Sequence, residues 1–317
     1  MSARDGVGVV GGGVWGLGLA AAAARTGKTA LLLSRRALNG SLPQGVTRAG
    51  DYAELAARAR LIVLAVPSSV ARTTARELGK HIDGRHLVVH GVRGLVGASM
   101  ETIGDVVREE TPARRIGALG GPALVEDLFA GRPSVLVCGS HFPEVGAAAS
   151  EAFTHETLRL YTIDDLRGLE WATALVGCLA IGMGFVQGIG ASPGLVAAVL
   201  SRAVHEAARL AEAAGGEERT LLGLAGYGDL FAAIGQEKRP EVTLGRLLAK
   251  RTPLQEALGA VGQRIEAVEL VPRVVAWAEA HGVRTPLFRA MAHGVLSPRP
   301  TEEILHELMT GPLESGS

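Results

Sequence analysis

Cysteine is nearly absent from this chain of 317 residues, which contains only Cys138 and Cys178. Both lie in apolar runs, and neither has a Cys or His neighbour at the spacing that zinc ligands take. We therefore expect no disulfide and no metal site. The two thiols are expected to be small buried side chains in a reducing compartment.

The chain also lacks an excess of charge of either sign. Its 32 Lys and Arg residues balance its 32 Asp and Glu residues, and the sequence has no basic or acidic block. Nucleic acid and membrane surfaces are therefore not indicated as partners. The N-terminus leads almost directly into an apolar strand and lacks the charged and apolar regions of a signal peptide. This pattern predicts a cytoplasmic location.

Charge is missing altogether between Glu170 and Arg202, a stretch long enough to span a bilayer. Several glycines, Gln187 and the Ser192-Pro193 step interrupt the apolar run. A central buried helix, a break and the start of a second helix explain this pattern better than a membrane span.

Residues 7–36 have the order of a nucleotide-binding unit. A short apolar strand leads into Gly11-x-Gly13-x-x-Gly16, followed by an Ala-rich helix and a second apolar strand. The first glycine permits a tight turn, the second lets the backbone approach a pyrophosphate, and the third lets helix and strand pack closely. We therefore expect a dinucleotide with its phosphates at the N-terminus of the helix.

The acidic residue that usually holds the ribose 2′-hydroxyl of NAD is missing. No Asp or Glu occurs between Asp5 and Asp51, and the second strand ends in Ser34, Arg35 and Arg36. Because hydroxyl and guanidinium groups suit a 2′-phosphate, NADP is expected, with NAD as the alternative. In a competing interpretation, Arg35 only stacks on the adenine and Arg36 is a solvated turn residue. The expected cofactor contacts are Gly11, Gly13, Val14, Trp15, Gly16, Ser34, Arg35, Arg36 and Pro67.

Strands and helices alternate over the first half of the chain, which predicts a mostly parallel sheet covered on both faces. Further strands are expected at 61–66, 86–90, 116–119, 134–138 and 158–162, and helices at 53–59 and 68–80. From Asp165 onward only helices are expected, with starts at Thr252-Pro253 and Thr285-Pro286 and stops at Gly215 and Gly282. The predicted fold is therefore α/β: an N-terminal Rossmann-type doubly wound sheet over residues 1–164, followed by an all-α domain over residues 165–317.

Six blocks in order narrow the family. They are GGGVWGLGLA at 11–20, LAVPSSVAR at 64–72, GGPALVEDLFAGRPS at 120–134, YTIDDLRGLE at 161–170, LSRAVHEAARLAEAAGG at 200–216 and GLAGYGDL at 223–230. In these blocks the chain resembles the bacterial NAD(P)-dependent glycerol-3-phosphate dehydrogenases along nearly its whole length. The resemblance implies hydride transfer between NAD(P)H and dihydroxyacetone phosphate, which gives sn-glycerol 3-phosphate for lipid synthesis. A cytoplasmic homodimer is expected.

The resemblance implies a catalytic role for two positions. Asp229 matches the family's Gly-x-Gly-Asp-Leu motif, in which the carboxylate orients the catalytic lysine or the substrate hydroxyls; a helix N-cap is the structural alternative. Arg93 stands where the family has its first lysine. An arginine keeps the charge and can hold an oxyanion or a phosphate, but it cannot be deprotonated. An exposed loop arginine is the alternative.

The second family lysine falls on Val176, followed by Gly177 in place of an asparagine. The usual proton donor is therefore replaced. The family's Ser-Arg-Asn phosphate cradle falls on Arg239, Pro240 and Glu241. After a small shift, Lys238 and Arg239 are expected to meet the substrate phosphate, whereas Glu241 would repel it; a solvated loop is the alternative.

His90 ends its strand three residues before Arg93, where doubly wound sheets place ligands. It is a candidate for the missing proton donor, and a packed histidine is the alternative. Three functions remain open: a glycerol-3-phosphate dehydrogenase, a divergent dehydrogenase for another small carbonyl or hydroxy substrate, and a nucleotide-binding protein without catalysis.

Overall fold

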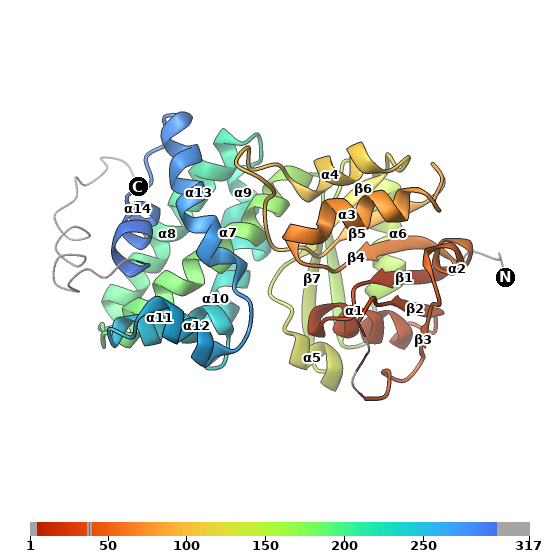
Figure 1. Ribbon diagram of the computed structural model, residues 1–317, viewed down its shortest axis with the longest axis horizontal. Helices are drawn as coiled ribbons and strands as arrows, with labels where there is room; N and C mark the ends of the chain where they lie inside the picture. Colours follow the sequence, from red (N-terminus) through yellow and green to blue (C-terminus); the bar gives the residue numbers. More distant parts are fainter. Residues whose placement is uncertain (1–4, 37, 39, 297–317) are drawn as a thin grey trace.

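The computed structural model describes residues 5–36, 38 and 40–296. In these residues the sheet has eight strands in the order β3-β2-β1-β4-β5-β6-β7-β8. Figure 1 shows this sheet with its helices on one side of the molecule and the later helices gathered on the other. The strands are β1 (Gly6–Val10), β2 (Ala30–Leu33), β3 (Val46–Arg48), β4 (Ala59–Leu64), β5 (Leu87–His90), β6 (Ile116–Gly120), β7 (Ser134–Gly139) and β8 (Leu158–Ile163).

Both faces of the sheet are covered, as the alternating pattern predicts. The helices of the first half are α1 (Val14–Arg25), α2 (Tyr52–Arg58), α3 (Ser68–Gly79), α4 (Ile103–Glu110), α5 (Val125–Ala130) and α6 (Pro143–Phe153). Alternate residues of β1 divide between two apolar clusters: Val7 and Val9 pack with α1, α5 and α6, whereas Val10 packs with α2, α3 and α4. The inner strands β1, β2, β5 and β6 are therefore buried on both sides, whereas the edge strands β3 and β8 have exposed residues.

The sheet is mostly parallel, but β6 and β7 run antiparallel, with Ala118 opposite Gly139. The sequence pattern shows which segments are strands but not this reversal. The pattern also misses β3 and the helices α4, α5 and α6. Most of these are short, and β3 has three residues and α5 six, so their hydrophobic periodicity covers too few positions to stand out.

The second half is helical, as expected. Its elements are α7 (Leu166–Gly188), α8 (Pro193–Ala213), α9 (Glu218–Leu222), the π-helical turn η1 (Leu224–Gly228), α10 (Asp229–Ile234), α11 (Pro240–Ala249), α12 (Leu254–Val261), α13 (Glu266–Ala280), α14 (Pro286–Ala290) and the π-helical turn η2 (Met291–Val295). The uncharged stretch forms a buried helix, a break and a second helix, which confirms that prediction. In the described part of the chain, α7 is the helix long and apolar enough to cross a membrane, yet 89% of its apolar window is buried inside the protein.

Helices α7 and α11 pack with their backbones in near contact. A Cβ on Gly245 of α11 would lie 2.0 Å from the carbonyl oxygen of Ile181, and a Cβ on Gly184 of α7 would lie 2.3 Å from that of Val242. Only glycine fits at these two positions, because a Cβ would meet backbone atoms of the facing helix, which cannot turn aside as a side chain could. The close approach fixes the N-terminus of α11 against α7.

Glu206 of α8 supplies the helix cap that sequence reasoning assigned to Thr285. Helix α14 does begin at Pro286, but the Thr285 hydroxyl is buried without a hydrogen-bond partner. The carboxylate of Glu206 instead accepts hydrogen bonds from the backbone N–H groups of Leu287 at 3.0 Å and Phe288 at 2.8 Å. A buried acid therefore ties α8 to the start of α14.

This arrangement predicts a specific pH dependence of stability. Burial raises the pKa of Glu206 from 4.5 to about 7, although the two backbone N–H groups, Arg209 and Arg202 act in the opposite direction. A carboxyl whose pKa is raised on folding contributes stability below its unfolded pKa and loses it as the pH rises through the folded value. We therefore expect Glu206 to contribute up to about 3 kcal/mol less stability at pH 8 than at pH 4.5.

The measurement is urea unfolding at intervals from pH 5 to 8 for the wild type, Glu206→Gln and Glu151→Gln. Glu151 is an exposed control on α6. The stability difference between wild type and Glu206→Gln should fall steadily as the pH rises, because the variant cannot ionise there. Parallel pH curves for these two proteins would contradict the assignment.

Candidate functional site

The glycine turn between β1 and α1 has the geometry that its sequence predicts. Gly11 has φ = 128°, and a Cβ on it would lie 2.1 Å from the carbonyl oxygen of Ala65. A Cβ on Gly16 would lie 2.0 Å from the carbonyl oxygen of Gly11. Gly13 differs, because nothing lies within 4 Å of its Cβ position and it begins α1 without a side-chain cap. The helix N-terminus is thus open to an anionic group, and the turn fits a dinucleotide pyrophosphate.

The end of β2 lies directly against this turn. A Cβ on Gly12 would come within 2.4 Å of Oγ of Ser34. The Ser34 hydroxyl donates to the carbonyl of Arg36 at 2.9 Å and accepts from its N–H at 3.2 Å. Arg35 and Arg36 are exposed. Ser34 therefore shapes a turn beside the glycines that is followed by two exposed arginines, residues of the type that suits a 2′-phosphate.

Three adjacent strands of the sheet end at the same edge. The glycine turn follows β1, Pro67 follows β4, and Arg93 follows β5. Ligands of doubly wound sheets bind at this edge, where the strand order reverses beside β1. The topology thus brings together residues that the sequence places in separate segments.

The helical half reaches this edge through Glu266, at the start of α13. Its Oε1 accepts a hydrogen bond from the backbone N–H of Ser68 at 3.0 Å, across 198 positions of sequence. Pro67 is the N-cap of α3 and leaves this N–H to the carboxylate. A Cβ on Gly94 would lie 2.7 Å from Oε2 of Glu266. Sequence reasoning did not select Glu266, because nothing distinguishes it from any acidic residue in a first helical turn.

Arg93 lies between the glycine turn and the end of β6. Its guanidinium carbon is 5.9 Å from the ring centre of Trp15, the second residue of α1. Its Nη2 donates to the carbonyl oxygen of Gly121 at 3.4 Å. The indole of Trp15 is seated over Gly91, where a Cβ would come within 2.5 Å of Nε1. The Trp15 ring and the Gly121 carbonyl therefore hold Arg93 at the edge of the sheet where the glycine turn lies, which we call the nucleotide edge.

The same arginine meets the aspartate of the Gly-x-Gly-Asp-Leu motif. Nη1 of Arg93 donates to Oδ2 of Asp229 at 2.6 Å, across 136 positions of sequence. Asp229 is 1% exposed and is the first residue of α10, and Gly228 occupies the N-cap position. Its carboxylate thus points at a cation rather than capping the helix. Two residues selected from separate patterns lie in contact.

Arg239 joins this pair. Its Nη1 lies 3.8 Å from Oδ1 of Asp229, and its Nε donates to Oε2 of Glu241 at 3.2 Å. Oδ1 of Asp229 is buried and has no hydrogen-bond partner in the described structure. We refer to Arg93, Asp229, Arg239 and Glu241 as the charge cluster. Lys238, the other expected phosphate contact, is exposed.

Val176 and Gly177 lie next to the charge cluster. The Val176 side chain is 1% exposed and packs in an apolar region that includes Leu221 and Leu230. Leu230 directly follows Asp229 in the sequence. A Cβ on Gly177 would lie 4.0 Å from Oε1 of Glu241. Position 176 thus provides apolar packing, and position 177 has no side chain between α7 and the neighbouring Ala267 and Glu241.

His90 is buried at 1% exposure and is bound to α7. Its Nε2 lies 2.9 Å from Oε1 of Glu170, an oxygen that also accepts from the backbone N–H of Gly104 at 2.6 Å. Nδ1 of His90 is buried without a partner. The structure thus pairs His90 with Glu170 rather than with a member of the charge cluster, and its role as a proton donor stays a prediction.

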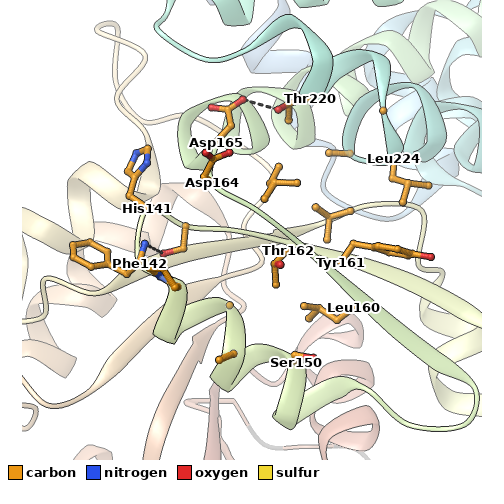
Figure 2. Close-up of a pocket in the computed structure, with 18 of the residues that line it drawn as sticks. His141, Phe142, Ser150, Leu160, Tyr161, Thr162, Asp164, Asp165, Thr220 and Leu224 are labelled. Carbon is orange, nitrogen blue, oxygen red and sulfur yellow. Dashed lines mark hydrogen bonds between the residues drawn. The ribbon is translucent and has the colours of Figure 1, made fainter.

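A groove of about 980 Å³ lies elsewhere, between β8 and α6 on one side and α9 and η1 on the other. Figure 2 shows two hydrogen bonds between residues that line it: the Thr220 hydroxyl donates to Asp165, and the backbone N–H of Phe142 donates to the Ser140 hydroxyl. None of the site residues expected from the sequence lines it. Its volume alone does not indicate a reaction site, and the chemistry gathers at the charge cluster.

Comparisons with known proteins identify the family to which this chain is similar. Residues 34–145 match the family model described as the NAD-dependent glycerol-3-phosphate dehydrogenase N-terminus, and residues 165–306 match its C-terminus. The chain is 31% identical to glycerol-3-phosphate dehydrogenase [NAD(P)+] of Gluconobacter oxydans, over 98% of this chain and 99% of the relative. It is also 31% identical to that of Moorella thermoacetica, over 99% of each. The crystal structure of glycerol-3-phosphate dehydrogenase from Coxiella burnetii superposes with a TM-score of 0.87 at 25% identity, covering 97% of this chain and 99% of the other.

Proposed function

The chain belongs to the NAD-dependent glycerol-3-phosphate dehydrogenase family, and from this premise we propose that it transfers hydride between NAD(P)H and dihydroxyacetone phosphate to form sn-glycerol 3-phosphate. The observation that carries the proposal is the 2.6 Å contact between Arg93 and Asp229 at the nucleotide edge. It joins the Rossmann-type half to the helical half where a reduced cofactor and a carbonyl substrate would meet.

The residues have separable roles in this reaction. The cofactor supplies the hydride, and the open N-terminus of α1 holds its pyrophosphate. Arg93 places positive charge beside the oxygen that becomes an alkoxide, and Asp229 holds Arg93 in position. Arg239 and Lys238 bind the substrate phosphate. His90 and Glu170 fasten β5 to α7 beneath this edge.

The division of labour follows the fold. We infer a nucleotide-binding domain over residues 1–164 and a substrate domain over residues 165–317, the end of which lies outside the described residues. We also infer a cytoplasmic homodimer that supplies glycerol 3-phosphate for lipid synthesis. Apolar side chains of one segment support the dimer, since Leu224, Tyr227 and Phe231 are 41%, 43% and 61% exposed.

Oxidation of NADPH by dihydroxyacetone phosphate, followed by absorbance at 340 nm with product identification, tests the proposal. NADPH binding without turnover of this substrate would overturn it. One observation favours a second candidate, a dehydrogenase for another small carbonyl compound. Arg239, at the position of the family's phosphate cradle, already donates a hydrogen bond to Glu241. Turnover of a different carbonyl substrate in the same assay would support that candidate.

The exposed arginines predict a cofactor preference. We expect NADPH to bind more tightly than NADH, and Arg36→Ala to weaken NADPH binding roughly 10- to 100-fold, because a charge-assisted hydrogen bond contributes about 1.5–3 kcal/mol. NADH binding should change little. Fluorescence titration of both cofactors measures this, with Arg60→Ala at the amino end of β4 as the control. Equal affinities in the wild type would remove the argument for a 2′-phosphate site.

A further inference from the structure

The charge cluster contains two groups that can take up and release a proton and two that cannot. Arginine stays protonated in proteins, so Arg93 and Arg239 supply charge but no proton transfer. The carboxyl groups of Asp229 and Glu241 remain. Their surroundings differ, and this difference separates their roles.

Asp229 is enclosed. It is 1% exposed, with Arg93 at 2.6 Å from one oxygen and Arg239 at 3.8 Å from the other. Both oxygens of this carboxylate thus face guanidinium groups, and Arg93 holds one of them by a hydrogen bond. Its Oδ1, buried and without a hydrogen-bond partner, points to a ligand hydroxyl that would donate to it. Asp229 is therefore suited to positioning Arg93 and a hydroxyl group of the ligand.

Glu241 is accessible. Its side chain is 22% exposed, and Arg239 engages Oε2 at 3.2 Å. Oε1 lies 4.0 Å from the Cβ position of Gly177, and the Cβ of Ala267 lies 3.7 Å from that same position. One carboxylate oxygen is thus held by Arg239, while the other lies over the backbone of Gly177.

Local structure explains this placement. Glu241 is in the first turn of α11, a helix of 10 residues. At Gly184 and Gly245 the backbones of α7 and α11 come close together, and this packing places Glu241 over Gly177. A Cβ at position 177 would already be in van der Waals contact with Ala267 and within 4.0 Å of Oε1 of Glu241.

We propose that Glu241 is a further catalytic residue, which exchanges the proton with the reacting oxygen of the substrate. This inference rests on the proposed function. In reduction, hydride adds to the carbonyl carbon, the π-electron pair moves to oxygen, and that oxygen takes the proton of the Glu241 carboxyl. The carboxylate so formed lies beside Arg239 and regains a proton from water. In oxidation, the same carboxylate accepts the hydroxyl proton.

The substrate phosphate prepares Glu241 for this step. A phosphate that binds Arg239 competes with Oε2 of Glu241 for the guanidinium. Since like charges in proximity disfavour ionisation, a phosphate dianion beside the carboxyl favours its protonated form. The bound phosphate thus favours protonated Glu241 at the place where the ketone binds. Substrate binding and proton transfer then both depend on Arg239.

The test compares wild type, Glu241→Gln, Glu241→Asp and the exposed neighbour Glu237→Gln. For each we measure kcat and KM for dihydroxyacetone phosphate with NADPH from pH 6 to 9, NADPH affinity by fluorescence, and thermal unfolding. Glu241→Gln should lower kcat by 10²- to 10⁴-fold, the range for loss of one general acid. NADPH affinity should stay within about twofold, and the limb of the pH profile due to the carboxyl should disappear. Glu241→Asp should keep that limb at reduced kcat, and Glu237→Gln should match the wild type.

The outcomes separate the two claims. An active wild type with an equally active Glu241→Gln variant overturns the role of Glu241 and leaves the proposed function intact. A rise in KM at unchanged kcat also overturns it, because Glu241 then only binds substrate. A wild type that binds NADPH and turns over no dihydroxyacetone phosphate overturns the proposed function and this inference with it. If Glu241→Gln does not fold, the pH profile of Glu241→Asp decides.

Discussion

Asp229→Asn is expected to lower turnover of dihydroxyacetone phosphate at least a thousandfold, while NADPH affinity changes little. The 1% exposed carboxylate holds Arg93 at 2.6 Å and lies 3.8 Å from Arg239. A neutral amide there leaves Arg93 without the counter-charge that orients it. Replacing a carboxylate that orients a catalytic side chain by an amide lowers kcat by up to about 10⁴-fold, and a thousandfold loss corresponds to about 4 kcal/mol of transition-state stabilisation.

Two companion variants separate charge from position. Asp105→Asn removes a partly exposed aspartate that pairs with Arg167, and its turnover should equal that of the wild type. Arg93→Lys keeps a cation opposite Asp229 but loses the fork that also reaches Gly121, so it should retain part of the activity. Turnover by Asp229→Asn within tenfold of wild type, with an unchanged melting temperature, would remove Asp229 from the mechanism.

Gly245→Ala should strongly destabilise the helical half, although it adds only one methyl group. The added carbon would lie 2.0 Å from the carbonyl oxygen of Ile181 and 2.6 Å from the N–H nitrogen of Phe185. Both are backbone atoms of α7, so α11 itself has to move away. Overpacking of this kind costs about 3 kcal/mol, equivalent to a fall of about 6 to 12 °C in melting temperature. Turnover should fall too, because Glu241 moves with its helix.

A glycine of the neighbouring helix provides the matched control. Gly259 lies inside α12, and nothing lies within 4 Å of its Cβ position. Gly259→Ala should therefore be neutral or stabilise the protein by about 0.5–1 kcal/mol, the ordinary gain for Ala over Gly in a helix. Equal melting temperatures for the two variants would contradict the close contact of α7 and α11.

Local patterns predicted the nucleotide-binding half well. Gly11, Gly13 and Gly16 specify a turn through their own backbone requirements, and the strands around it are continuous apolar runs, so neighbouring residues suffice for the prediction. The antiparallel pairing of β6 and β7 depends on how distant segments pack, and no pattern within either strand encodes it. The cap of α14 failed for the same reason, because its acceptor, Glu206, lies about 80 residues away.

The candidate site divides in a similar way. Arg93 and Asp229 were selected from separate motifs, and the fold brings them into contact. Glu241 was noted in the sequence only as a group that would repel phosphate, because its position over Gly177 depends on the packing of α7 and α11. Glu266 was missed altogether. Its bond to the backbone of Ser68 spans 198 positions, and no local signal marks it.

The burial of α7 has a consequence for how this chain can be divided or recombined. Residues of α7 such as Leu169 and Ala172 belong to one continuous apolar cluster with Leu64 and Ile103 of the sheet half. The chain boundary near residue 164 is therefore not a boundary between independent cores, and opening of either half exposes the other. A chimera that joined residues 1–164 to the helical half of a distant relative would inherit a mismatched central helix. We expect such an exchange to fold only when α7 is kept together with the sheet against which it packs.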